Sequence, residues 1–444
     1  MSPAASTLDL PFARRRLSNG LDVIVHEDHR VPIVAVNIWY HVGSKDERPG
    51  MTGFAHLFEH LMFEGSQHHD KGYFPPLQQA GAQLNGSTNT DRTNYWEVVP
   101  TSAVDRALWM ESDRMGYLLP ALTPERFETQ RKVVLNERRQ TYENRPYGLA
   151  LMALMAGLFP FDHPYRWPTI GDVPDLEAMQ FDDVREFFRA YYGPANASLV
   201  LAGDLATEDG FELADRYFGD LPAGQRPAPV HAAASLAGER RLVLEDRVEL
   251  PRLYLAWHSP AMFAADDAEL DLVADLVANG KAARLYRTLV YEDRVALDVS
   301  ASQQSRELSS VFVLAATAAP GKSLADVAAR VDVALTELAA NGPTDAEMER
   351  ARAQVESNFL YRLQTVGGFG GKSDQLNAYN VMRGEPGYFM QDLERYDSAT
   401  QQSVRVAAGR YLMAEGRVAL SIVPRGQAGS ALPGSEPANG SFLE

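Results

Sequence analysis

The chain contains no cysteine among its 444 residues. Disulfide bonds and thiolate metal sites are therefore excluded, and any zinc ion must be held by histidine and carboxylate side chains. A cysteine-free protein suits a reducing cytosol and an oxidising periplasm equally, so this absence does not decide between the two compartments.

Long apolar runs and an excess of positive charge are also missing. No stretch approaches the roughly 20 apolar residues of a membrane-spanning helix, and residues 1–12 lack the basic-then-apolar pattern of a secretory signal. The formal net charge of −17 argues against nucleic acid and anionic membranes as partners. We therefore expect a protein of the bacterial cytoplasm or periplasm with no membrane span.

The length and the order of segments predict two domains. Hydrophobic residues make up 45% of the chain, which is normal for a folded protein, and 444 residues exceed one ordinary core. Residues 220–235 are rich in Pro and Ala and show no amphipathic period, as in an interdomain linker. The prediction is a domain over 1–219, this linker, a second domain over 236–424, and a disordered Gly/Ser/Pro-rich tail over 425–444.

The two predicted domains repeat one pattern. In the first half, strand-like segments at 21–26 and 34–41 precede a helical segment; in the second half, 241–245 and 253–258 precede a helix over 266–278. Both halves also end with a similar strand-like run. This order predicts an α+β fold with two homologous domains, each a mainly antiparallel sheet flanked by helices.

The segment His56-Leu-Phe-Glu59-His60 carries the clearest chemical signal. Two imidazoles four residues apart lie on one face of a helix and can reach a single metal ion, and the order His-x-x-Glu-His is the inverted zincin motif. The alternative is a pair of core histidines bonded to backbone carbonyls. Burying these three polar groups without partners would cost on the order of 2 kcal/mol or more each, which favours the metal site.

The second half provides an internal control for this motif. Aligning Gly65 with Gly280 sets His56, Glu59 and His60 against Asp271, Ala274 and Asp275. The expected helix is therefore repeated while the metal-binding side chains are not, and only the first half is predicted to hold the site.

A catalytic zinc site needs a third protein ligand beside an open position. Glu137 is the best candidate, because the segment 123–140 has an N-cap signal and apolar residues at helical spacing. Its counterpart in the second half is Asn358. A glutamate on a long helix is usually just solvated, so the residues alone leave its role open.

Taken together, these residues resemble a known family. His56-x-x-Glu59-His60 followed at long range by Glu137 resembles the signature of the pitrilysin/insulinase family of zinc metallopeptidases, and the segments 85–88, 91–95 and 163–165 agree with it. The two-repeat organisation looks like the mitochondrial-processing-peptidase-like branch, whose subunits pair. The resemblance implies an endopeptidase acting on peptides or unfolded polypeptides, with one Zn²⁺ per chain held by His56, His60 and Glu137 and with Glu59 as general base.

Asn85, Gly86 and Ser87 resemble the edge strand on which this family binds an extended substrate by β-addition. A structural alternative is a turn before the next strand, which is the usual interpretation of an Asn-Gly pair. The residues themselves leave both interpretations open.

Two departures from the family pattern bear on partners. Gln130 stands where many family members carry a second glutamate. Val290 and Leu297 stand where self-sufficient members carry an Arg and a Tyr that hold the substrate. Arg287 and Arg294 are nearby in the sequence but out of register with these two positions. The resemblance therefore implies the zinc-bearing subunit of a heterodimer, whose homologous non-catalytic partner supplies the Arg/Tyr pair. A self-dimer is the other possibility.

Two rival functions are less favoured. The glycine-rich segment 366–373 nearly matches a phosphate-binding loop, but its first glycine position holds Val366 and it follows a predicted helix. We expect a mobile loop there. A non-enzymatic scaffold or chaperone-like subunit of the same fold is the second rival, and the intact motif argues against it.

Overall fold

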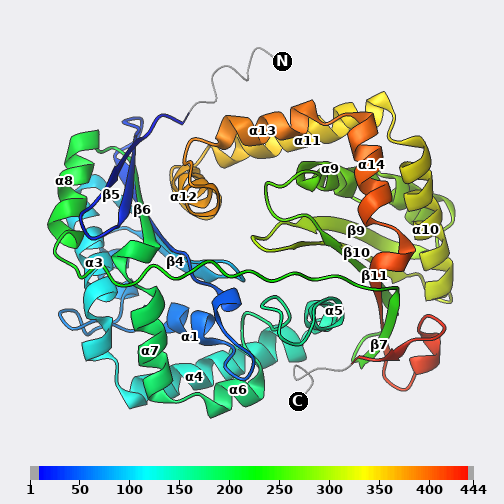
Figure 1. Ribbon diagram of the computed structural model, residues 1–444, viewed down its shortest axis with the longest axis horizontal. Coiled ribbons are helices and arrows are strands. Elements are labelled where there is room, and N and C mark those ends of the chain that lie inside the picture. Colours follow the sequence, from blue (N-terminus) through cyan, green and yellow to red (C-terminus); the bar gives the residue numbers. More distant parts are fainter. Residues whose placement is uncertain (1–9, 439–444) are drawn as a thin grey trace. The chain divides into compact units, whose positions relative to one another are not determined.

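The computed structural model describes residues 10–438 and divides them into two compact units. Unit 1 contains residues 10–136, 169–230 and 357–392, and unit 2 contains 137–168, 231–356 and 393–438 (Figure 1). The boundaries cross three helices, so α4, α11 and α13 each contribute residues to both units.

The sheet of unit 1 is built entirely from the first half of the chain. Its strands are β1 (Ala13–Arg16), β2 (Asp22–Glu27), β3 (Ile33–Tyr40), β4 (Gln83–Thr88), β5 (Thr93–Pro100) and β6 (Ala197–Gly203), in the order β1-β2-β6-β3-β5-β4. Only β2 and β6 pair in parallel, so the sheet is mainly antiparallel, as predicted. Strand β4 lies at one edge of this sheet.

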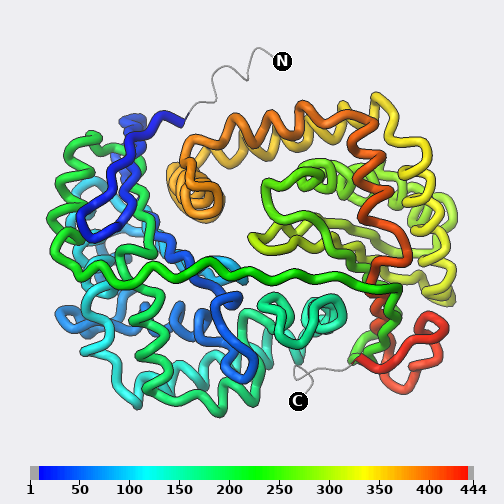
Figure 2. The backbone as a smooth tube through the Cα atoms, viewed as in Figure 1, coloured from blue at the N-terminus to red at the C-terminus, as the bar shows by residue number. Residues whose placement is uncertain are grey.

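The helices of unit 1 surround this sheet. They are α1 (Phe54–Leu61), α2 (Phe74–Gln79), α3 (Val104–Ala121), most of α4 (Pro124–Arg138), α6 (Val173–Ala178), α7 (Phe181–Tyr191), α8 (Thr207–Phe218) and α12 (Lys372–Arg383). Helix α12 contacts β3 and β6, and Asn377 donates to the backbone and side chain of Asn37 at 2.8 Å. Figure 2 shows this orange helix beside strands from the blue and green parts of the chain.

Unit 2 repeats the arrangement with the second half of the chain. Its strands are β7 (Arg240–Asp246), β8 (Arg252–Ser259), β9 (Ala296–Gln304), β10 (Ser310–Ala318), β11 (Arg417–Pro424) and β12 (Glu436–Pro437), in the order β12-β7-β11-β8-β10-β9. Its helices are α5 (Ala150–Leu158), α9 (Asp267–Val277), α10 (Leu324–Asn341), most of α11 (Asp345–Arg362), most of α13 (Phe389–Ser398) and α14 (Gln401–Tyr411). The predicted two-repeat α+β fold is confirmed.

The compact units differ from the predicted halves by an exchange of segments. Helix α12 from the second half joins unit 1, and α5 from the first half joins unit 2, where it contacts β8 and β11. At this contact, a Cβ added to Gly157 would lie 3.1 Å from Leu242 and Val418. Both sheets must cover an apolar face, and local periodicity cannot tell which half supplies the covering helix.

The tail prediction is wrong for residues 425–438. A 3₁₀ turn at Ala428–Ser430 leads into β12, which pairs in parallel with β7. Residues 439–444 of the predicted tail, and residues 1–9, lie outside the described residues. The predicted linker contains neither helix nor strand over 222–235.

Between Leu10 and Ala438, none of the helices combines the length and the apolar character required to cross a membrane.

Candidate metal centre

Helix α1 presents an apolar side to the protein and a polar side with the motif residues. Phe54, Leu57, Phe58 and Leu61 are buried, and the ring of Phe58 lies 5.1 Å from that of Tyr192 and 5.8 Å from that of Phe187. His56, Glu59 and His60 are half-buried, and the two imidazole centroids are 4.9 Å apart. Packing of the aromatic face therefore fixes which way the histidines face.

Helix α4 brings Glu137 to the same place. One ligand atom from each of His56, His60 and Glu137 lies within 4.8 Å of the other two. Within residues 10–438, this is the one group of three or more His, Asp or Glu side chains with such a geometry. Two imidazole nitrogens and a carboxylate oxygen match the three-ligand pattern of catalytic zinc sites, so the donor set fits Zn²⁺.

The residue after Glu137 explains why this carboxylate faces the histidines. Arg138 is 1% exposed, and its Nε donates to Glu143 at 3.0 Å. Consecutive helical residues point about 100° apart, so burial of Arg138 leaves Glu137 on the half-exposed side. Burial also raises the pKa of the Tyr142 hydroxyl, and the nearby Glu137 charge raises it further.

Gln130 connects helix α4, which carries Glu137, to the turn that follows α1. Its Nε2 donates to Glu64 Oε1 at 2.5 Å, and Glu64 lies four residues after His60. The amide of Gln130 can donate a hydrogen bond to the carboxylate of Glu64, whereas a glutamate at position 130 would repel that carboxylate. This bond explains the departure from the family pattern.

Arg92 is a site residue that the sequence did not single out. Burial lowers the pKa of its guanidinium, whereas the carboxylates of Asp374, Glu59 and Asp91 raise it. Its Nη1 donates to the Ser87 carbonyl oxygen on β4 at 2.8 Å. Arg92 therefore lies between the predicted base and the edge strand. The only signal was its place within the family-like segment 91–95.

The segment Asn85-Gly86-Ser87 is part of strand β4, so the turn interpretation is wrong. Its register with β5 pairs Asn85 with Trp96 and Gly86 with Tyr95. A Cβ added to Gly86 would lie 3.0 Å from the rings of Phe63 and Tyr95, so glycine permits the close approach of the segment after α1. The outer edge of β4 pairs with no other strand of the described sheet.

In the second half, the residues that correspond to His56 and His60 form hydrogen bonds with neighbouring side chains. Asp271 accepts from the Tyr396 hydroxyl at 2.7 Å, and Asp275 accepts from Asn279 Nδ2 at 2.9 Å. Burial raises the pKa of Asp275. Asn358 lies in α11, as predicted.

The residues at the expected Arg/Tyr positions lie at one end of the second sheet. Val290 is half-buried in a π-helical turn (Tyr286–Glu292), and Leu297 on the edge strand β9 is 52% exposed. Arg287 pairs with Glu292 at 3.2 Å, and Arg294 adopts a positive φ of 52°.

The glycine-rich loop connects two helices, α11 and α12, so the predicted absence of a preceding strand is confirmed. Gly370 N donates to Asp374 Oδ2 at 2.8 Å, and a Cβ on Gly367 would lie 2.5 Å from Val98 Cγ2. Because Gly367 has no side chain, the backbone of the loop can pack directly against Val98 of β5 in the sheet of unit 1.

Comparisons with known proteins identify the family. The model of the Insulinase (Peptidase family M16) family matches residues 22–163, and that of the Peptidase M16 inactive domain matches residues 178–355. The "Zinc protease PqqE" of Helicobacter pylori is 28% identical over 397 residues, which cover 88% of each chain. An "Uncharacterized zinc protease" of Mycobacterium tuberculosis is 26% identical over 435 residues, 96% of each chain.

Solved structures share the fold. A protease from Helicobacter pylori superposes with a TM-score of 0.86 at 24% identity, covering 94% of this chain and 100% of that one. A peptidase M16 inactive domain from Pseudomonas fluorescens superposes with a TM-score of 0.82 at 19% identity, covering 94% and 98%. The two family models match most of the chain in the order of its two sheets, and the chain belongs to the pitrilysin/insulinase (M16) family of peptidases.

Proposed function

We propose that the chain is a zinc metalloendopeptidase subunit that hydrolyses peptides or unfolded polypeptides. The observation that carries this proposal is the convergence of His56 and His60 from α1 with Glu137 from α4. Relatives named zinc proteases support the same assignment. A scaffold subunit of this fold would have no need to keep two imidazoles and a carboxylate within 4.8 Å of one another.

Zn²⁺ held by His56, His60 and Glu137 would supply a Lewis acid that acidifies water and polarises a peptide carbonyl. Glu59, one residue before His60, accepts the proton of the attacking water and returns it to the leaving amine. The Arg92 guanidinium is close enough to this carboxylate for the charge of Glu59 to raise the Arg92 pKa.

The edge strand supports a preference for extended substrates. A peptide that pairs with the open edge of β4 at Asn85, Gly86 and Ser87 must itself be extended, so folded proteins are excluded. Because the segment after α1 approaches β4 at Gly86, a peptide on this edge lies beside the motif helix. The specificity is then for unfolded backbone more than for particular side chains.

A homologous partner subunit is part of the proposal. The half-buried Val290 and the exposed Leu297 offer apolar groups where an Arg and a Tyr hold substrate in self-sufficient members. A partner that supplies such a pair would complete substrate binding, and a self-dimer would lack it. Mixing this chain with a homologous subunit encoded nearby should raise peptidase activity well above that of the chain alone.

The decisive experiment combines metal analysis with hydrolysis of an unfolded fluorogenic peptide. The wild-type chain should hold about one zinc per chain and cleave the peptide, much faster with the partner subunit than alone. Glu59→Gln should keep the zinc and lose hydrolysis by roughly 10²–10⁴-fold, because general base catalysis is removed. Glu125→Gln, at an exposed position in the first turn of α4, is the matched control. Full hydrolysis by the Glu59→Gln protein would refute the mechanism.

A further inference from the structure

The N-terminus of α1 lacks a capping side chain of its own. The first N–H groups of any helix have no partner inside it and need one outside. Here the N-cap residue is Gly53, which has a φ of 94° and no side chain. A helix of eight residues is also too short to be stable without outside contacts. The helix that carries both predicted histidine ligands therefore depends on a group from another segment.

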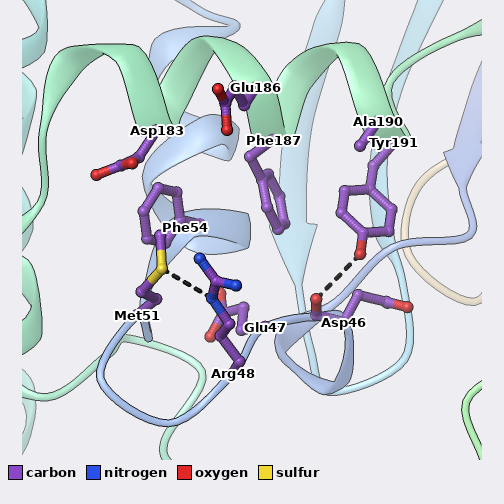
Figure 3. A pocket seen from close by; sticks show the side chains of 10 residues that line it. All are labelled: Asp46, Glu47, Arg48, Met51, Phe54, Asp183, Glu186, Phe187, Ala190 and Tyr191. Atoms are coloured by element: carbon purple, nitrogen blue, oxygen red, sulfur yellow. Dashed lines mark hydrogen bonds between the residues drawn. The ribbon is translucent and has the colours of Figure 1, made fainter.

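Glu47 supplies that group. Its Oε1 accepts from Ala55 N at 2.8 Å and its Oε2 accepts from Gly53 N at 3.0 Å. The residue is 9% exposed, and Figure 3 shows it among the residues that line a pocket between the start of α1 and helix α7. This pocket has a volume of about 300 Å³.

The segment that presents Glu47 is itself held in place. The backbone of the 3₁₀ turn Ser44–Asp46 bonds to the loop before β5, with Ser44 N donating to Asn89 O at 3.1 Å and Lys45 N donating to Thr90 O at 2.9 Å. After Glu47 the chain turns back through a bridge between Arg48 and Met51. The sheet therefore fixes Glu47, and Glu47 fixes the first turn of α1.

Both side-chain oxygens of Glu47 accept a backbone N–H group. A protonated carboxyl or a carboxamide has only one oxygen that accepts freely, whereas two N–H groups donate here. Burial raises the pKa of Glu47 well above its usual value, the charges of Asp46 and Asp175 add to this, and the two N–H groups offset it only in part. The positive end of the helix dipole at this terminus further favours a negative charge.

We infer that Glu47 is a positioning residue for the metal site, which orients His56 by clamping the first turn of α1. Ala55, whose N–H it holds, immediately precedes His56, so the clamp sets the rotation of the helix at the first predicted ligand. This inference rests on the proposed zinc site. Glu47 touches neither substrate nor metal and acts only through α1.

The alternative is that Glu47 stabilises the fold without affecting metal binding. Glu47→Gln separates the two roles, because the amide keeps the volume but places an NH₂ group against one of the two N–H donors. Glu47→Asp keeps both oxygens on a side chain one methylene shorter and should give a smaller effect in the same direction.

The matched control lies on α9, the second-half counterpart of α1. Asp267 there is 2% exposed, and its Oδ2 accepts from Phe263 N at 2.9 Å. Asp267→Asn removes a buried carboxylate from a helix that carries no predicted ligand. It should lower stability and leave zinc affinity unchanged.

The experiment measures zinc affinity by competition with a chromophoric chelator, and amide hydrogen exchange over 53–62 in the zinc-free protein, at a temperature where every variant is folded. Glu47→Gln should weaken zinc binding by roughly 10- to 100-fold, the usual effect of losing a residue that orients a ligand. It should also accelerate exchange in the first turn of α1. Unchanged zinc affinity in the Glu47→Gln variant would overturn the inference, whether or not exchange is accelerated.

The two proposals fail in different ways. Wild-type protein that binds no zinc would refute the proposed function, and the exchange data would then decide by themselves whether Glu47 holds the helix. Wild-type protein that binds zinc, beside a Glu47→Gln variant of equal affinity, would refute only the positioning role.

Discussion

Helices α1 and α9 occupy corresponding places in the two units and differ in what their polar sides do. Each follows the second long strand of its half, and each buries an apolar side against its own unit. The polar side of α1 holds His56 and His60 toward Glu137, whereas Asp271 and Asp275 of α9 bond to neighbouring side chains. The packing surface is thus repeated while the chemistry is not.

The same contrast appears in the long helices α4 and α11. Glu137 of α4 joins the two histidines, and its counterpart in α11 is Asn358. The match of residues 178–355 to a domain described as inactive agrees with this difference. The fold of the second unit forms without these three side chains, so their presence in the first half calls for a functional explanation.

The largest effect is expected from removing the predicted third ligand, Glu137. Glu137→Gln should weaken zinc binding by more than the roughly 10- to 100-fold that loss of an orienting contact costs, because a charged ligand becomes a neutral one. Metal analysis after dialysis should find well under one zinc per chain. Asn358→Asp, which adds a carboxylate at the corresponding position of α11, is the control and should leave zinc content unchanged. Equal zinc content in the Glu137→Gln and wild-type proteins would remove this residue from the site.

Much of this contrast could be predicted from the sequence, because it depends on local patterns. The strands on either side of each motif helix follow from short β-rich runs, and the spacing of His56 and His60 places both on one helical face. The convergence of Glu137 with them followed only from the family resemblance. No local pattern says which way a half-exposed glutamate points.

The features that the sequence did not predict depend on contacts between residues that are distant in sequence. The exchange of α5 and α12 between the units reflects which sheet face each helix covers, and β12 depends on pairing with β7. Glu47 resembles any surface glutamate in the sequence, and its role follows only from two backbone N–H groups at the start of α1. Polar residues that bond to backbone leave no periodic signal.

The next prediction tests whether the second half lacks only the substrate-binding pair. Val290→Arg combined with Leu297→Tyr should raise peptide hydrolysis by the chain alone by about 10-fold, the effect of roughly 1.4 kcal/mol of added binding. The steady-state rate on an unfolded peptide at low concentration measures this gain. Val333→Arg, at a 57% exposed position on α10, is the control for added charge. A rate equal to the wild type would argue against a missing pair at these two positions.

A smaller effect is expected at the bond between α4 and the turn that follows α1. Gln130→Glu places a second carboxylate beside Glu64, and the resulting repulsion should weaken zinc binding several-fold by separating α1 from α4. Adding Glu64→Gln restores a donor and an acceptor in the reverse order, so the double variant should recover most of the affinity. A double-mutant cycle on zinc affinity measures the coupling. Additive losses would show that the two side chains do not act as a pair.

The smallest effect concerns the histidines of unit 2, which are used differently from those of unit 1. His163 is buried, its Nδ1 accepts from Tyr165 N at 3.0 Å, and its ring stacks on Phe159 at 4.3 Å. Burial and, to a smaller extent, the neighbouring His258 lower its pKa from 6.5 to about 4. The imidazole is therefore neutral in the folded protein at pH values where the unfolded chain is protonated.

The sign of the pH dependence follows from this difference. Above pH 6.5, His163 is neutral in both the folded and the unfolded state, so it does not affect the free energy of unfolding. As the pH falls from 6.5 to 4, the unfolded state binds a proton that the folded state does not, and the free energy of unfolding declines. Below pH 4 both states are protonated and His163 causes no further loss. His163→Asn keeps an acceptor for Tyr165 N and removes the titration, so the variant should lose less stability than the wild type in urea unfolding over this range. His231→Asn, at an exposed position, should keep the wild-type slope. Parallel slopes for wild type and His163→Asn would mean that His163 does not contribute to the acid sensitivity of unit 2.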